Sequence, residues 1–209
     1  MNSNVLKSLA ESIKLADEQR EILVGLMLGD GHLETQNKGR TFRLKVEHAI
    51  SQQAYVEWLY VKFKNLTVTG PQIKEQMVKN VMRQKFWFNT LSASTFRFYG
   101  QLFYINRKKV IPKTISKLVT PLSLAVWFMD DGSLKSTEHK ARILNTHCFS
   151  ELDLKRLQDM FLKKFHIETT LRKQKEGKQI YIPSGEVEKF ITLIEPFIIP
   201  SMEYKIKLT

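Results

Sequence analysis

Two similar stretches, far apart in the chain, constrain its fold more than any other feature. Residues 23–31 read LVGLMLGDG and residues 124–132 read LAVWFMDDG, so that in each an apolar run ends in an acidic residue followed by glycine. A helix that is apolar on all sides must be buried, and glycine commonly follows the last helical turn. The two stretches therefore predict two buried helices, one in each of two similar halves.

The acid that ends each run is a candidate metal ligand. Asp30 and Asp131 lie where the last helical carbonyls lack partners and the helix dipole is negative, so a lone carboxylate is disfavoured there. A hard cation such as Mg²⁺ would stabilise it, because Mg²⁺ binds carboxylate and carbonyl oxygens. If the two helices pack side by side, the acids meet, and bound ions would relieve their repulsion. One such run is more often a core helix with a polar turn; two copies in a basic chain favour a shared site.

The composition favours a nucleic-acid partner. Lys and Arg number 33 against 21 Asp and Glu, for a net charge of +12, and both halves share the excess. A basic excess spread over a whole folded chain is typical of proteins that bind a polyanion. The single cysteine, Cys148, excludes an internal disulfide and a cysteine-based zinc cluster. No apolar run is long enough to cross a membrane and no secretion signal is visible, so we expect no membrane association.

The hydrophobic pattern predicts the same order of elements twice, namely helix, strand, helix, two strands, helix. Each first strand is preceded by a short strand near 32–35 or 133–136, and a further short helix is expected over 4–16. Domains are therefore expected over 1–105 and 121–209, joined by a connecting segment over 106–120. In the first half we expect strands over 41–47, 71–78 and 84–90 and helices from Ser51 and over 92–105. In the second we expect strands over 142–147, 168–175 and 178–183 and helices from Ser150 and over 184–196.

The outward faces of these strands are expected to contact DNA. Over residues 41–47 the alternation is strict, which places Phe42, Leu44 and Val46 in the core and the polar residues outside. Arg, Asn and Gln can pair with purine edges in the major groove, whereas Lys more often meets phosphates. His48 and His147, which follow the first long strand of each half, are interpreted as structural. The candidate DNA-binding residues are Arg43, Lys45, Lys74, Gln76, Lys85, Asn89, Arg142, Arg172 and Gln174.

Both apolar runs resemble the LAGLIDADG motif of the homing endonucleases. From about residue 20 onward the chain is similar to the monomeric, two-motif members that are encoded in group I introns. The resemblance implies an α+β fold of two pseudo-twofold αββαββα halves, with antiparallel saddle-shaped sheets, packed through the two motif helices. It also implies a Mg²⁺-dependent double-strand break with short 3′ overhangs at a long site in double-stranded DNA. Mn²⁺ is expected to substitute, and Ca²⁺ to bind without supporting cleavage.

The resemblance also implies roles for individual residues. Asp30 and Asp131 correspond to the metal-binding acids, and Gly29 and Asp130 to residues that offer backbone carbonyls to the metals. Two lysines, Lys109 before the Val-Ile-Pro of the connecting segment and Lys205 after Met-Glu-Tyr, correspond to lysines that polarise the attacking water or neutralise the phosphate. Lys108 is the rival of Lys109. The chain departs from the motif at Leu28 and Met129, where the consensus has an acid, and carries Asp130 where the first copy has Gly29.

An RNA-binding intron maturase on the same scaffold is the alternative function, and the intron's own RNA is then a partner. The two acids and the two lysines favour cleavage, because a pure RNA binder would not need the carboxylates. A DNA-binding regulator would need a further recognition domain, and an intein would begin with Cys or Ser and end in His-Asn. The protein is expected where the genome carrying the intron resides, in an organelle or a bacterial cytoplasm.

Overall fold

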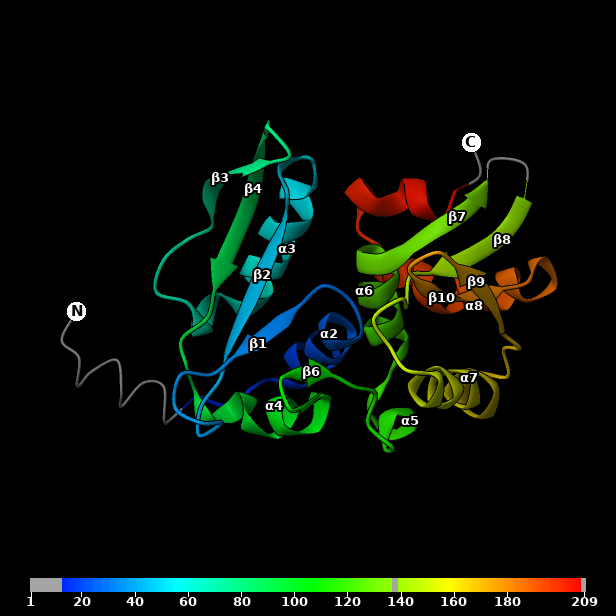
Figure 1. The fold of residues 1–209 in the computed structure, drawn as a ribbon, viewed down its shortest axis with the longest axis horizontal. Helices are drawn as coiled ribbons and strands as arrows, with labels where there is room; N and C mark the ends of the chain where they lie inside the picture. The colour runs from blue at the N-terminus through cyan, green and yellow to red at the C-terminus, as the bar shows by residue number, and fades with distance from the viewer. Residues whose placement is uncertain (1–12, 137–138, 208–209) are drawn as a thin grey trace. The chain divides into compact units, whose positions relative to one another are not determined.

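The computed structural model describes residues 13–136 and 139–207, and its elements follow one order twice (Figure 1). The expected α+β fold, with the order αββαββα in each half, is confirmed. The first half contains α2 (Asp17–Leu28), β1 (His32–Glu34), β2 (Arg43–Ala49), α3 (Gln53–Phe63), β3 (Gln72–Val78), β4 (Val81–Asn89) and α4 (Arg97–Phe103). The second contains α6 (Pro121–Asp131), β7 (Gly132–Ser136), β8 (His139–Leu144), α7 (Glu151–Phe165), β9 (Thr170–Gln174), β10 (Gly177–Ile182) and α8 (Val187–Ile194).

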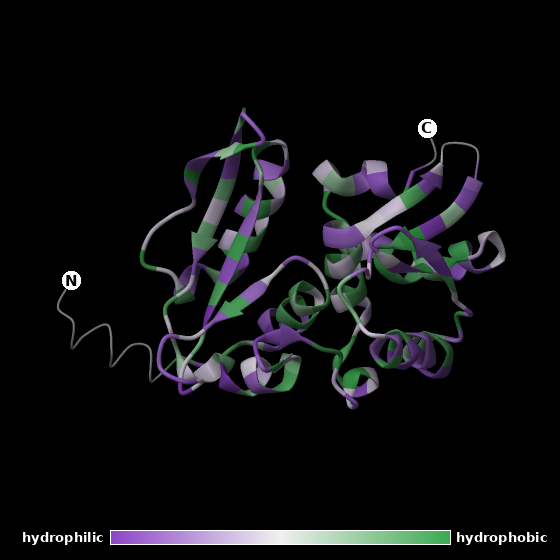
Figure 2. Cartoon of the chain, viewed as in Figure 1, coloured by the Kyte–Doolittle hydropathy of each residue, from purple (hydrophilic) through white to green (hydrophobic). Residues whose placement is uncertain are grey.

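Each half builds a four-stranded antiparallel sheet with equivalent topology. The strand orders are β1-β2-β4-β3 and β7-β8-β10-β9, so the short strands expected near 32–35 and 133–136 form one edge of each sheet. In β2 the alternation is as expected, because Leu44 and Val46 are buried while the residues between them are partly exposed. Figure 2 shows this alternation of hydrophobic and hydrophilic residues along the strand. One face of the first sheet is therefore apolar and the other is polar.

The helix α2 divides between the two compact units of the chain. One unit comprises the chain up to Arg20 and Asp30–Gln101; the other comprises Glu21–Gly29 and the chain from Leu102 onward. Most of α2 thus packs with the second half, although it precedes the first sheet in sequence. The cause is that residues 22–28 are all buried, and α6 supplies the apolar surface that they need.

The packing of α2 against α6, expected from the two motifs, is confirmed. Ser123 Oγ donates a hydrogen bond of 2.9 Å to the backbone oxygen of Glu21. At Gly25 the helices approach so closely that an added Cβ would lie 2.5 Å from the Ser123 oxygen and 2.7 Å from the Val126 Cβ. Thr120 caps the start of α6 by accepting the Ser123 N–H at 3.2 Å, and Pro121 occupies the first turn. The two apolar runs thus form the centre of the second unit.

The structure corrects the expected helices at their ends. The helix expected over 92–105 ends at Phe103, and Tyr104–Ile105 (β5) instead pairs with Lys108–Lys109 (β6). Asn106 and Arg107 make the turn of this hairpin with φ of 49° and 64°. Short α5 (Ile115–Leu118) follows in the connecting segment, and 3-10 turns flank α8. Of the helix expected over 4–16, residues 4–12 lie outside the described part, and residues 13–16 are not helical. None of the described helices is long and apolar enough to cross a bilayer.

Candidate functional site

The C-terminal ends of α2 and α6 meet at Gly29 and Asp130. The Gly29 N–H still bonds to the Gly25 oxygen at 3.0 Å, which continues the helical turn to the end of the motif. A Cβ added at Gly29 would lie 2.6 Å from the Asp130 Cβ and would overlap its carboxylate. Glycine is therefore required here by close approach. The acids predicted to bind metal, Asp30 and Asp131, are the next residues along the chain from this contact.

The two predicted lysines bind backbone oxygens at these helix ends. Lys109 Nζ, on β6, donates to the Gly29 oxygen at 2.6 Å. Lys205 Nζ, at the end of the 3-10 helix Pro200–Lys205, donates to the Asp130 oxygen at 3.1 Å and also to the Met129 oxygen. An ammonium is favoured there, because the last carbonyls of a helix are unpaired and carry the negative end of its dipole. Lys108, the rival of Lys109, is exposed on the same strand, and the choice between the two lysines stays a prediction.

Asp30 opens onto the polar face of the first sheet. Its side chain is 55% exposed, and it lines a hollow of about 220 Å³ together with His32, Lys45 and Glu47. The His48 Nδ1 lies 3.9 Å from the Asp30 Oδ2, and the His48 ring is buried against Tyr55 at 5.2 Å between centroids. His48 is buried, as a structural residue would be, and it also borders the candidate metal ligand. Asp30 thus connects the end of the motif to the basic sheet surface.

Asp131 is the last residue of α6, and its backbone oxygen accepts the Asn145 N–H at 3.1 Å. This bond ties the end of the helix to the end of β8. The Asn145 side chain in turn accepts a hydrogen bond from Gln179 on β10. Polar side chains of the second sheet therefore gather beside the second motif acid. The meeting of Asp30 with Asp131 stays a prediction.

The donor atoms at the motif ends fit a hard divalent ion. Carboxylate and carbonyl oxygens are the ligands that Mg²⁺ takes, usually one or two carboxylates with waters and substrate phosphates completing the shell. Within the described residues, no group of three or more His, Cys, Asp and Glu side chains is placed to form an all-protein cage.

All six candidate DNA-binding residues of the first half share the outer face of its sheet. Residues paired across antiparallel strands point to the same side. Lys45 pairs with Asn89, Lys74 pairs with Lys85, and Gln76 pairs with Arg83. The outward positions that the alternation predicts are confirmed, while their contacts with DNA stay a prediction. This outer face comprises His32, Glu34, Arg43, Lys45, Glu47, Gln72, Lys74, Gln76, Arg83, Lys85, Trp87 and Asn89.

One acid at the centre of this face has a role that the sequence analysis did not assign. The Glu47 Oε1 accepts a 2.6 Å hydrogen bond from Lys85 Nζ. Its Oε2 lies 3.5 Å from Lys45 Nζ and 3.9 Å from Lys74 Nζ. Burial alone would raise the pKa of Glu47, but the Lys85 hydrogen bond and the charges of all three lysines outweigh it, so this pKa is lowered. The sequence alternation predicts that Glu47 lies on the outer face of the sheet, but its three lysine partners are visible only in the structure.

In the second sheet two candidates occupy outward positions, as expected, and a third does not. Arg172, opposite Gln179, stacks on the Tyr181 ring at 4.9 Å, and Gln174 is exposed near the hairpin turn. The expected outward position of Arg142 is wrong, because this side chain is buried and donates to the Ile206 oxygen at 2.6 Å. Its burial also lowers the pKa of the guanidinium.

The cause lies in β8, where residues 141–144 are all buried. Arg142 pairs with the buried Ile182, and Leu144 pairs with the buried Ile180, so Arg142 points to the helix-covered face of the sheet and not to the face of Arg172. Gln179 and Tyr181, which share the face of Arg172, were not among the candidates. Their alternation with the buried Ile180 and Ile182 in β10 is the signal that could have found them.

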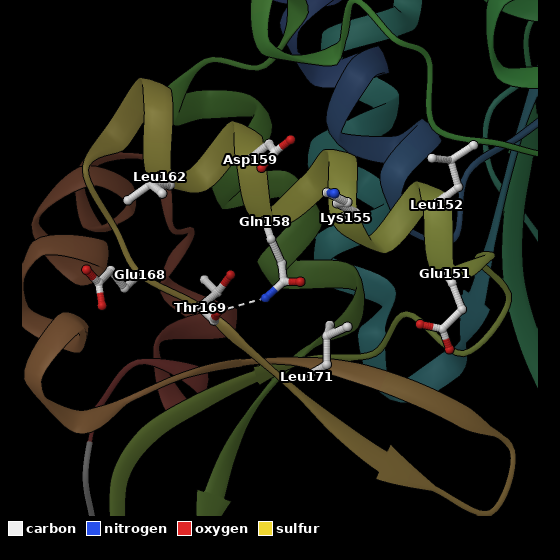
Figure 3. A pocket seen from close by; sticks show the side chains of 9 residues that line it. All are labelled: Glu151, Leu152, Lys155, Gln158, Asp159, Leu162, Glu168, Thr169 and Leu171. Atoms are coloured by element: carbon white, nitrogen blue, oxygen red, sulfur yellow. Dashed lines mark hydrogen bonds between the residues drawn. The ribbon is translucent and has the colours of Figure 1, made fainter.

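A separate hollow lies between α7 and β9 (Figure 3). Its volume is about 780 Å³, and Leu152, Leu162 and Leu171 contribute apolar side chains to it. Leu171 and Arg172 are neighbours on one strand, so they point to opposite faces. The hollow therefore lies on the helix-covered side of the second sheet, and it contains none of the predicted site residues.

Comparison with known proteins decides the family. The model of the LAGLIDADG DNA endonuclease family matches residues 20–190, which include both motifs. The chain belongs to this family. The LAGLIDADG chain is 31% identical to a protein of Wickerhamomyces canadensis named "Probable intron-encoded endonuclease 1", over 98% of its own length and 91% of the relative. It is 33% identical to the cytochrome b mRNA maturase bI2 of Saccharomyces cerevisiae over 88% of its length, which spans 46% of that maturase.

A solved structure agrees with this membership. The homing endonuclease I-WcaI bound to its DNA recognition sequence superposes on the LAGLIDADG chain with a TM-score of 0.94 and 28% identity. The match covers 100% of this chain and 94% of I-WcaI. The fold expected from the two motifs, including both four-stranded sheets, is therefore that of a homing endonuclease.

Proposed function

We propose that this protein is a site-specific homing endonuclease that makes a double-strand break in DNA with the help of a divalent metal ion. The observation that carries the proposal is the contact of Gly29 with Asp130, which brings the ends of both motif helices together. An acidic residue, Asp30 or Asp131, follows directly in each motif. Asp30 itself lines a hollow on the basic outer face of the first sheet, together with Lys45. The proposal includes a long recognition site, short 3′ overhangs, a monomeric protein and an intron-encoded origin.

The motif ends would hold Mg²⁺ through Asp30, Asp131 and the backbone oxygens of Gly29 and Asp130, with Mn²⁺ able to replace it. Ca²⁺ would bind the same oxygens without supporting cleavage. When bound, a divalent ion lowers the pKa of a water that attacks the phosphorus and stabilises the leaving oxygen. The chain's own contribution is to fix these oxygens at the end of two rigid helices, so that the scissile phosphate is held in one orientation.

Lys109 and Lys205 would act on the phosphate and the attacking water. Each ammonium is anchored at the carbonyl end of one motif helix, beside one of the two acids. A cation held at this position offsets the charge that develops on the phosphoryl oxygens. One lysine per motif also matches a reaction in which each DNA strand is cut once.

The sheets would bind the duplex through their outer faces. Arg43, Lys45, Lys74, Gln76, Lys85 and Asn89 form the contact of the first sheet, and Arg172 and Gln174 that of the second. Arg, Asn and Gln side chains can make paired hydrogen bonds with purine edges, and a lysine ammonium can donate either to a phosphate or to the O6 and N7 of guanine. Arg142 does not contribute to this contact, because its side chain is buried.

The experiment that tests the proposal is cleavage of a randomised duplex library by the purified protein with Mg²⁺. Sequencing of the cut ends should reveal one long site with short 3′ overhangs, and EDTA should abolish the reaction. A library that stays uncut with Mg²⁺ and with Mn²⁺, although the protein is folded, would refute the nuclease.

A maturase function is the second candidate, and the similarity to the cytochrome b mRNA maturase bI2 favours it. A protein of this scaffold that assists intron folding would bind its own intron RNA. The test is in vitro splicing of the host intron with and without the protein. Acceleration of splicing by Asp30→Asn, which should not cleave DNA, would establish RNA assistance as an activity separate from cutting.

A further inference from the structure

A carboxylate at the centre of a DNA-facing surface repels the phosphates that the surface should attract. Glu47 is such a residue: it lies on the polar side of β2, a central strand of the sheet, directly opposite Trp87 of β4. Glu34, the other acid on the outer face, lies on the edge strand β1. The side chain of Glu47 is 16% exposed, so it is packed into the surface and does not extend from it. Its position therefore needs an explanation from its neighbours.

Those neighbours are three lysines, each on a different strand. Lys45 is on β2, Lys85 on β4 and Lys74 on β3, and all three ammonium groups lie within 4 Å of the Glu47 carboxylate, at 3.5, 2.6 and 3.9 Å. The Oε2 atom is buried and accepts no hydrogen bond within the described residues. One carboxylate thus attracts three cations that would otherwise repel one another.

We propose that Glu47 is a specificity-determining positioning residue, which holds these three lysines over the middle of the sheet. The inference rests on the proposed binding of DNA by this face. A free lysine is a hydrated point charge on a flexible stem, and about half or more of the hydrogen bonds between proteins and DNA go to the phosphates and sugars. A lysine tethered to Glu47 stays at the middle of the face and still has N–H groups to donate, because an ammonium has three.

The tether changes what these lysines read. Over the middle of a sheet lying in the major groove, base edges are nearer than phosphates, and an ammonium there can donate to the O6 and N7 of guanine. The carboxylate also weakens the sequence-independent attraction to the backbone, which raises the ratio of specific to non-specific binding. Glu47 therefore favours binding to sites with G·C base pairs beneath this face, although Glu47 itself does not contact the bases.

The test compares Glu47→Gln and Glu47→Asp with the wild type in binding a randomised duplex library without divalent ions. Glu47→Gln releases all three lysines, so non-specific affinity should rise and the slope of log affinity against log salt should steepen by about one to three units. Preference for the base pairs beneath this face should fall roughly tenfold. Glu47→Asp keeps the charge but shortens the reach; the preference should fall while non-specific affinity stays near wild type.

Glu75→Gln is the matched control, because Glu75 lies on the other face of the sheet and accepts a hydrogen bond from Gln84. Its salt slope and base preference should equal those of the wild type. An unchanged slope and preference in Glu47→Gln, in a protein that circular dichroism shows to be folded at the assay temperature, would overturn the inference.

A second measurement needs no DNA, so it separates this inference from the proposed function. Acylation of the free protein followed by mass spectrometry gives the reactivity of each lysine. In the wild type Lys85 should be acylated several-fold more slowly than the exposed Lys79. In Glu47→Gln the acylation rate of Lys85 should approach that of Lys79. If the library shows no sequence preference in the wild type, the proposed function fails while the tether is still tested; equal Lys85 reactivity in both proteins refutes the tether itself.

Discussion

Gly25 on α2 lies directly against the backbone of Ser123 on α6, with no space between them for a side chain. We therefore expect Gly25→Ala to destabilise the fold by about 1–3 kcal/mol, because a methyl group in a packed contact forces the helices apart. Gly185→Ala is the matched control, since no atom lies within 4 Å of the position of its added Cβ. Thermal and urea unfolding of the three proteins measure the difference. Equal stability of Gly25→Ala and the wild type would contradict the packing.

Replacement of either motif acid by its amide should separate cleavage from binding. Asp30→Asn or Asp131→Asn should lower the cleavage rate by about 1000-fold, because a metal ion contributes several kcal/mol to stabilisation of the transition state. Affinity for DNA without metal should stay within a few-fold of wild type. Asp159→Asn, at a partly exposed acid on α7, serves as control. Near wild-type cutting by Asp131→Asn would remove that acid from the mechanism.

The two neighbouring lysines of β6 should behave differently. Lys109→Met should slow cleavage on the order of 100-fold by removing a cation beside the scissile phosphate. Lys108→Met should leave it nearly unchanged, since Lys108 is exposed and Lys109 is the one that reaches the Gly29 oxygen. Single-turnover rates with saturating enzyme isolate the chemical step from binding. Equal rates in the two variants would refute the assignment.

Substitutions of Arg142 and Arg172 should have different effects on stability and on base preference, although both residues lie in the second sheet. Arg142→Met should lower the unfolding temperature and leave the base preference intact, because its guanidinium bonds to the Ile206 backbone inside the second unit. Arg172→Ala should keep the stability and relax the preference at one or two base pairs by roughly tenfold. The library selection and thermal unfolding, run on both variants, check the pair. A shifted base profile in Arg142→Met would show that the buried guanidinium acts on DNA.

The lowered pKa of Glu47 predicts how the wild type and Glu47→Gln differ in stability with pH. A carboxyl whose pKa is lower in the folded protein contributes stability that is present above its unfolded value, about 4.3, and is lost as the pH falls through the folded value. The wild type should therefore be more stable than Glu47→Gln at pH 7, and this gap should close on acidification below about pH 4. If the stability difference between the two proteins instead widens on acidification, the pKa of Glu47 is raised in the folded protein and not lowered.

Much of the fold follows from local patterns that a single sequence carries. The strict alternation from Phe42 to Glu47 fixes which face of β2 is buried, and the apolar runs identify both central helices. The pattern fails where tertiary contacts decide. Arg142 pairs with the buried Ile182 and so points to the inner face of its sheet, and Tyr104–Ile105 pairs with Lys108–Lys109 instead of continuing the helix that precedes it.

The candidate site divides in the same manner. The acids and glycines of the motifs can be recognised in the sequence alone, because a repeated apolar run ending in Asp-Gly is unusual. Neither the bond of Lys109 to the Gly29 oxygen nor the three partners of Glu47 could be predicted from spacing, since each depends on cross-strand register or on a helix end distant in sequence. Residue type predicted the chemistry, and only the fold identified the partners.

The membership of Glu21–Gly29 in the unit that resumes at Leu102 has a consequence for biosynthesis. During translation α2 emerges well before α6, the helix that covers it. The nascent chain therefore exposes an aggregation-prone apolar surface until α6 has left the ribosome. A backbone cut in the hairpin at Asn106 and Arg107 should likewise yield two fragments that are each insoluble alone and that recover the native assembly only when they are refolded together.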